Sequence, residues 1–111
     1  MSSADEIFDA AIELKEADKL DEAVGKLEEL IGQEPGFVLA HAGLSVCYGA
    51  LERHDEAVEH AQKVCELDPE DPFSFMAKSI VCQKAGRMQE AEEALARAME
   101  MQWAAARKAQ P

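Results

Sequence analysis

A repeat of 34 residues constrains this chain more than any other feature of its sequence. The dipeptide Glu-Ala occurs three times at that spacing, at Glu22-Ala23, Glu56-Ala57 and Glu90-Ala91. Two prolines, Pro35 and Pro69, keep the same interval. Similar units of this length are typical of helix–turn–helix pairs, which stack because a single pair cannot bury its apolar face alone. The repeat therefore predicts an all-α array of stacked hairpins.

Small residues recur in the same register. Ala11, Ser45 and Ser79 each lie twelve residues before the alanine of a Glu-Ala pair, which predicts that two helix backbones approach closely there. Leu27 and Leu95 are expected to fill the space between neighbouring hairpins, although Ala61, at the equivalent position of the second unit, breaks this series. The agreement of these registers argues against a chance recurrence of two abundant residues.

The second unit carries the clearest family resemblance. It contains Ala40, Leu44, Ser45 and Tyr48, followed by Asp55-Glu56-Ala57 and Leu67-Asp68-Pro69, and at these positions it resembles the tetratricopeptide repeat. The resemblance covers residues 4–37, 38–71 and 72–105, and implies a single domain over 4–111 in which 106–111 extend the last helix. The fold class that it implies is an all-α, right-handed superhelix (an α-solenoid) of three hairpins and six helices.

The first and third units depart from the family pattern. Ala10 and Leu14 stand where the family prefers Leu and Tyr, and Lys78 occupies a position that is usually apolar. Trp103 stands where a proline would close the third repeat. Because no proline intervenes before Pro111, we expect the last helix to run past the point where a repeat normally turns.

Local signals predict helices near residues 4–17, 21–33, 37–51, 55–67, 71–85 and 88–109. Asp21 and Asp55 are predicted N-caps, each followed by acidic residues where the helix dipole favours negative charge. Asp71 and Pro72 are predicted as the N-cap and the first residue of the fifth helix, because proline has no N–H to leave unpaired there. Pro35 and Pro69 are expected to end the helices before them.

The resemblance also implies an inner wall formed by the first helix of each hairpin. Position by position, it assigns to this wall Asp5, Phe8, Asp9, Ile12, Leu39, Ala42, Gly43, Val46, Phe73, Met76, Ala77 and Ile80. The candidate partner-binding residues among them are Phe8, Ile12, Leu39, Gly43, Val46, Phe73, Met76 and Ile80. We expect this mostly apolar groove to bind a peptide or an amphipathic helix of another protein.

Instead of binding a partner, each of these residues could be buried in the chain's own core. Gly43 and Gly49 fit either close approach by a partner's backbone or tight packing within the chain, since both are costly in a helix. One branch of the family holds the C-terminal carboxylate of heat-shock chaperones with a clamp of Lys, Asn and Arg. The matching positions here are Phe8, Ile12, Gly43, Phe73 and Ala77. None has a side chain that donates a hydrogen bond, so that function is disfavoured.

The last helix carries a second candidate surface. Leu95, Met99 and Trp103 recur every four residues and lie on one face, where they form either an oligomer face or a stripe that folds back on the third hairpin. Tryptophan is a frequent anchor in interfaces. The alternative function is therefore a self-assembling structural element, with a homodimer as the simplest form, that uses the groove and this open helix face.

Charge limits the kinds of partner. The net charge is -12 and the pI about 4.5, which excludes an electrostatic grip on nucleic acid or on an anionic membrane surface. The charge is uneven, with eleven acids and three bases in residues 1–34 (net -8), eight and two in 35–71 (net -6), and four and six in 72–111 (net +2). In an elongated fold such asymmetry favours head-to-tail or antiparallel contact between copies, or a basic partner on the acidic half. A protein partner is expected.

The sequence predicts no site for chemistry. Three histidines and three cysteines are present at His41, His54, His60, Cys47, Cys65 and Cys82, but no pair has zinc-ligand spacing. We expect the cysteines to be small buried hydrophobes, and His54 to be solvated or capping at a repeat turn. No nucleophile elbow, phosphate loop or zinc-protease motif occurs. We expect no enzyme activity, no cofactor and no metal. The absence of a signal peptide or membrane span and the odd number of cysteines favour a cytoplasmic protein.

Overall fold

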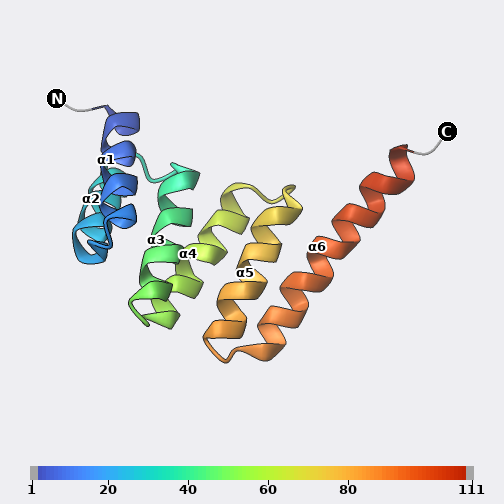
Figure 1. Ribbon diagram of the computed structural model, residues 1–111. Helices are drawn as coiled ribbons and strands as arrows, with labels where there is room; N and C mark the ends of the chain where they lie inside the picture. Colours follow the sequence, from blue (N-terminus) through green and yellow to red (C-terminus); the bar gives the residue numbers. More distant parts are fainter. Residues whose placement is uncertain (1–2, 110–111) are drawn as a thin grey trace.

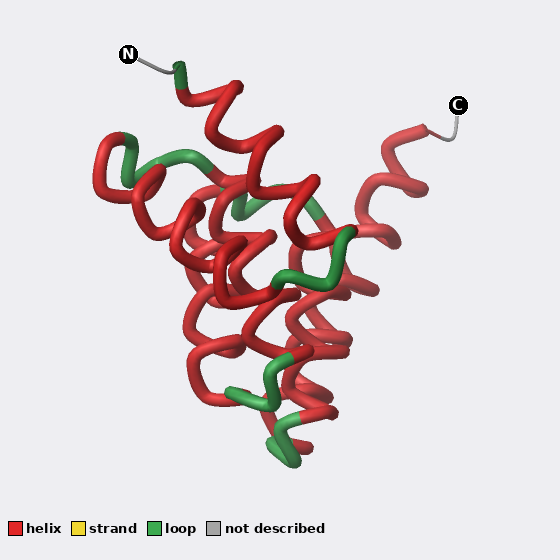
Figure 2. Tube along the Cα trace, turned by 60° about the vertical axis from the view of Figure 1, so that its left-hand side comes forward, coloured by secondary structure: helices red, strands yellow, loops and turns green. Residues whose placement is uncertain are grey.

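The computed structural model describes residues 3–109, which form six helices and no strand (Figures 1 and 2). The helices are α1 (Ala4–Glu16), α2 (Leu20–Gln33), α3 (Val38–Ala50), α4 (His54–Leu67), α5 (Pro72–Lys84) and α6 (Met88–Ala109). Every helix boundary lies within one residue of its sequence prediction. Residues 110–111, the end of the predicted extension, lie outside the described residues. None of the helices in the described part is long and apolar enough to cross a membrane.

The helices are arranged as three hairpins that stack into a right-handed superhelix. Each hairpin joins neighbours in sequence (α1 with α2, α3 with α4, α5 with α6), and the second helix of one hairpin packs on the first helix of the next. Helix α3 also contacts both α1 and α5, whereas α2, α4 and α6 do not contact one another. The first helices therefore form an inner row, which is why they can present one continuous wall. The molecule is elongated, with extents of 50 × 33 × 22 Å.

The turn inside each hairpin has the same backbone geometry. Asp18, Glu52 and Gly86 stand 34 residues apart and all have positive φ, at 61°, 61° and 76°. The next amide closes a ring in each case, as where Lys19 N donates to Leu14 O at 2.8 Å. This left-handed position favours glycine, because a Cβ atom there meets the neighbouring carbonyl oxygen. Only the third unit has the favoured residue.

The predicted N-caps at Asp21 and Asp55 are wrong. The cap positions are Lys19 in α2 and Arg53 in α4, and neither makes a side-chain capping bond. The reason is the tight turn, which starts the helix one residue earlier and places each aspartate inside the first turn. Arg53 instead holds Glu56 through two hydrogen bonds of 2.7 and 2.6 Å. The prediction for α5 is confirmed, since the Asp71 side chain accepts from Phe73 N at 2.9 Å.

The small residues in register lie where the two helices of a hairpin touch. Ala11, Ser45 and Ser79 are buried, as predicted. Ser45 Oγ donates to Ala57 O at 2.9 Å, and Ser79 Oγ donates to Ala91 O at 2.8 Å. A hydroxyl that crosses to the facing backbone explains why these buried positions tolerate serine. The alanines of the Glu-Ala pairs are also buried, so the repeat marks the seam of each hairpin.

Large residues fill the space between hairpins. Leu27, Leu30 and Leu44 are fully buried, and Leu27 reaches from α2 to α3. The three cysteines are free and buried, as expected of small apolar residues. Burial raises the pKa of each thiol above its usual value, because a thiolate would lose its water.

Helix α6 is the longest, with 22 residues against 13 in α5. Figure 1 shows that it continues past the start of α5 towards the C-terminus. The prediction that this helix runs on without a break is confirmed as far as Ala109.

Candidate partner-binding groove

Four large apolar side chains of the inner row face solvent. Leu39 and Val46 of α3 are 57% and 55% exposed, and Phe73 and Ile80 of α5 are 67% and 54% exposed. These values are high for residues of this type in a folded domain. All four belong to the predicted groove. The part of the wall formed by α3 and α5 is thus the most apolar open surface of the inner row.

Val46 and Ile80 lie together across the junction of α3 and α5. They line a hollow of about 340 Å³, here called the α3–α5 pocket, whose other apolar walls are Gly49, Ala77 and Val81. The hollow is shallow and opens to solvent, which suits a side chain on a partner's surface better than an enclosed small molecule. Its lining also includes Ser45, Ala50, His54 and Lys84.

The other predicted groove residues are partly buried. Phe8 packs on Phe37, with ring centroids 5.8 Å apart, and contributes to the core formed by the first two hairpins. Ile12 and Met76 are of intermediate exposure. Met76 is also contacted from α6, since Gln102 Nε2 donates to its sulfur at 3.9 Å. Part of the apolar surface of these three residues is therefore buried by contacts within the chain.

The two glycines of α3 differ in their surroundings. A Cβ atom on Gly43 would lie 3.1 Å from Leu27 Cδ1, so packing within the chain accounts for that glycine. A Cβ atom on Gly49 would meet nothing within 4 Å. Gly49 therefore has no intramolecular reason to lack a side chain, and it lines the α3–α5 pocket.

His54 belongs to this pocket, which the sequence interpretation missed. It is the first residue of α4 rather than a cap, and it is half-buried rather than solvated. Its Nδ1 atom is buried and has no hydrogen-bond partner among the described residues. Helical spacing could have added Gly49 and Lys84, which follow Val46 and Ile80 by three and four residues. His54 comes from the next helix, so only the fold brings it here.

A separate polar cluster joins α2, α3 and α4. His41 Nε2 lies 2.9 Å from the carbonyl oxygen of Pro35, and His41 Nδ1 lies 3.1 Å from His60 Nδ1. A carbonyl only accepts, so His41 carries its proton on Nε2 and His60 donates from Nδ1. Tyr48 stacks on His60 and donates to Glu28 at 2.8 Å. Burial, and then this bond to Glu28, raise the pKa of Tyr48 to about 12.

Burial also lowers the pKa of His60, against the opposing charge of Glu28. Within residues 3–109 no three His, Cys, Asp or Glu side chains are grouped so that they could hold a metal ion. The two imidazoles thus form a hydrogen-bonded pair that joins α3 to α4 within the second hairpin, and the bond from Tyr48 to Glu28 joins that hairpin to α2 of the first.

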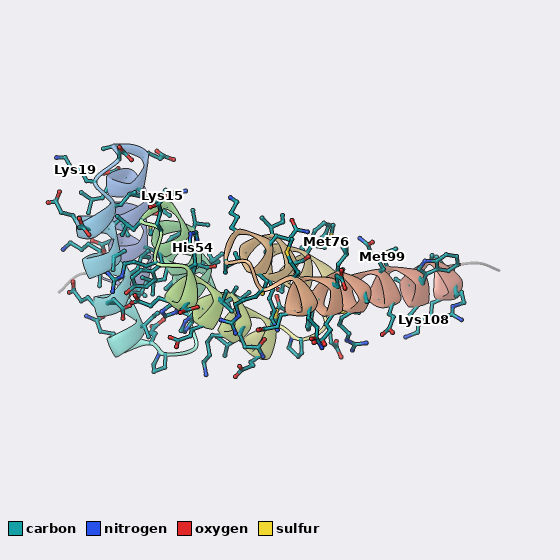
Figure 3. The ribbon with its side chains drawn as sticks, turned by 90° about the horizontal axis from the view of Figure 1, so that it is seen from below. Lys15, Lys19, His54, Met76, Met99 and Lys108 are labelled. Atoms are coloured by element: carbon teal, nitrogen blue, oxygen red, sulfur yellow. The ribbon has the colours of Figure 1, made fainter. Side chains whose placement is uncertain are left out.

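The predicted stripe on the last helix is also exposed. Leu95, Met99 and Trp103, here called the α6 face, are 40%, 50% and 65% exposed. The expectation that Leu95 fills the space between hairpins is therefore wrong, because α5 is the only described helix that packs on α6. The stripe does not fold back on the third hairpin, where Ala91, Ala94 and Ala98 are the buried residues of α6. Figure 3 labels Met76 on α5 and Met99 on α6 of the third hairpin. The α6 face is therefore a second open apolar surface besides the inner wall.

Comparison with known families agrees with this architecture. A model of the tetratricopeptide repeat matches residues 8–72, which is more than half of the chain. The chain belongs to the tetratricopeptide repeat family. Members of this family are interaction modules, and the exposed inner wall is consistent with that general role. A search of the curated proteins found no match to the sequence.

Several solved structures share this tetratricopeptide fold. A crystal structure of MamA is 19% identical, with a TM-score of 0.90, and the match covers 98% of this chain and 60% of that one. The type III secretion translocator chaperone SycD of Yersinia enterocolitica, in an alternative dimer, is 20% identical, with a TM-score of 0.81 and coverage of 90% and 77%. A CopN–Scc3 complex is 16% identical, with a TM-score of 0.84 and coverage of 91% and 61%. The chain thus spans about three-fifths of the MamA structures, and these likenesses show the fold alone.

Proposed function

We propose that this protein binds an amphipathic helix or extended peptide of another protein across the α3–α5 part of its inner wall. The observation that carries the proposal is the joint exposure of Leu39, Val46, Phe73 and Ile80. Two similar structures come from proteins whose names describe assembly with others, a translocator chaperone and a CopN–Scc3 complex. We propose no catalytic role.

The energetics favour anchors of moderate strength. Fully burying a large aliphatic or aromatic side chain is worth roughly 1.5–3 kcal/mol. Between a third and a half of each of the four residues is already covered, so a partner gains roughly 0.8–2 kcal/mol per residue. Ordering and association costs offset part of that sum. A partner that fills the α3–α5 pocket with one large apolar side chain gains most.

The proposed partner also carries polar features. A donor or acceptor beside its main anchor would satisfy the unpaired Nδ1 of His54. Asp5 and Asp9 are exposed on α1, at the acidic end of the wall. Basic residues at the end of the partner that lies over α1 would be attracted there, and the attraction would weaken in salt.

Peptide selection followed by point variants tests this function. A displayed library of amphipathic helical peptides is selected on the wild type, and the affinity of the best peptide is measured by fluorescence anisotropy. Val46→Asp and Ile80→Asp should each weaken binding roughly tenfold or more, because each adds a carboxylate that loses its water on binding. Met88→Asp is the matched control, since Met88 is 59% exposed but does not line the pocket. Equal affinity in all three variants would refute the groove.

Self-association is a second candidate function, and one observation favours it. The α6 face leaves three large apolar side chains open on a single helix. This surface is distinct from the α3–α5 pocket, so the two candidate functions can be tested separately.

A further inference from the structure

We infer that the α6 face is a two-fold interface, in which α6 of one copy packs antiparallel on α6 of a second copy. The inference rests on the second candidate function, self-association, and adds the geometry of the contact. Four observations support it: the repeat position of Leu95, the charge on α1, the apolar side chains around Met99, and the distribution of charge along α6.

The repeat position of Leu95 marks a surface that accepts a helix. Leu27 occupies the same position two repeats earlier, and it packs on α3 where Gly43 leaves room. In the described chain no helix follows α6, so Leu95 is 40% exposed where Leu27 is 1% exposed. A helix that packs on Leu95 therefore completes a contact that the fold makes elsewhere.

The first helix of a second copy does not suit this position. Leu27 packs on Gly43, and the residue of α1 at the position equivalent to Gly43 is Asp9, which is exposed. Head-to-tail stacking would press this carboxylate against the apolar side chain of Leu95 and strip its water. Such a contact is also heterologous, so it leaves an uncovered face at each end unless its rotation closes a ring. A closed two-fold contact between like faces avoids both problems.

The apolar side chains of α6 suit an antiparallel partner. Met99 is the middle residue of the face, so a two-fold axis at Met99 sets Leu95 of one copy opposite Trp103 of the other. Shallow hollows flank Trp103 on both sides, lined by Met99, Gln102 and Ala106 on one and by Ala96, Glu100 and Arg107 on the other. The smaller leucine can enter beside the larger tryptophan, as in interdigitated helix packing.

Charges along α6 are complementary only when the helices run in opposite directions. Glu92 lies three and seven residues before Leu95 and Met99, which places it on the same helix face. Arg107 borders the other end of the face, and among the described residues it has no carboxylate within ion-pair distance. Antiparallel pairing brings Arg107 of one copy to Glu92 of the other, twice by symmetry. Parallel pairing would place Glu92 beside Glu92. Near the axis, Glu100 is already paired with Arg97 of its own helix at 3.5 Å.

A disulfide trap tests where the copies meet. The native cysteines are buried, so mild oxidation should report only on an introduced thiol. Met99→Cys should form covalent dimers, because the axis brings the two side chains together. Val46→Cys is the matched control on the inner wall, with 55% exposure against 50% for Met99. Stronger cross-linking of the Val46 variant would overturn the proposed interface.

A charge exchange tests the direction of the helices. In sedimentation equilibrium, Arg107→Glu and Glu92→Arg should each weaken dimerisation roughly tenfold, because each creates two like-charge contacts. The double variant should recover the wild-type dissociation constant to within about threefold. A double variant no better than either single one, or a wild type that stays monomeric at about 100 micromolar, would overturn the inference.

The same variants separate this inference from groove binding. Circular dichroism should show unchanged helix content, since both charged residues are exposed. The selected groove peptide should bind wild type and charge variants equally. If the charge variants lose dimerisation but still bind the peptide, the groove proposal is unaffected. If a variant loses peptide binding but still dimerises, the groove proposal is weakened and the α6 interface is unaffected.

Discussion

Replacing Gly49 with alanine should raise stability and lower affinity for the partner. Gly49 lies in the last turn of α3, where glycine costs roughly 0.5–1 kcal/mol relative to alanine. A new Cβ atom there would meet nothing within 4 Å. The gain is therefore unopposed, and the midpoint of thermal unfolding should rise by roughly 2–6 °C.

The added methyl group would project into the α3–α5 pocket, where we propose that a partner comes close. Displacing a well-fitted partner by one carbon costs roughly 1–3 kcal/mol, which corresponds to about a fivefold to hundredfold loss of affinity. Differential scanning calorimetry measures the first effect and fluorescence anisotropy with the selected peptide measures the second. An unchanged affinity would refute the close approach at Gly49.

Two other glycines control the experiment. Gly25 is exposed in α2 and also has open space around it, so Gly25→Ala should raise the melting temperature by a similar amount and leave affinity unchanged. Gly43→Ala should lose the gain in stability, because its Cβ atom would press on Leu27 at 3.1 Å. A melting temperature that falls in Gly49→Ala would show that this position is strained in a way that the open space does not suggest.

Three further predictions concern the scaffold. Glu52→Gly should raise the free energy of unfolding by roughly 1 kcal/mol, and Gly86→Ala should lower it by a similar amount, because φ is positive at both positions; urea denaturation checks the pair. Burial lowers the pKa of His60, so the unfolded chain takes up its proton more readily than the folded one. Stability should be full above the ordinary histidine value of about 6.5 and fall as pH drops through it, and His60→Asn should flatten that part of the profile. The three cysteines are buried and the pKa values of their thiols are raised, so Ellman's reagent should react with them only at the rate of unfolding. Fast labelling of the folded protein would contradict this.

The repeat made the positions of the helices predictable, but the residues predicted to cap α2 and α4 were wrong. The 34-residue register located all six helices to within a residue, since the helical period, the prolines and the small residues agreed. The aspartates at 21 and 55 looked like caps because that residue type usually caps. The left-handed residue at 18 and 52 set the helix start instead. Gly86 could have revealed this turn from the sequence, because it occupies the same repeat position as Asp18 and Glu52 and is the residue type that a left-handed conformation favours.

The sequence by itself determined the family, the stacked hairpins and the set of residues from which an inner wall is built. Each of these depends on a periodic pattern along the chain, which local propensity and spacing reveal. Only the tertiary structure decided that Leu27 fills the room beside Gly43 while Gly49 stays open, that Phe8 packs on Phe37, and that His54 joins the pocket. Exposure depends on which side chains arrive from a neighbouring helix, and residues in equivalent repeat positions meet different neighbours.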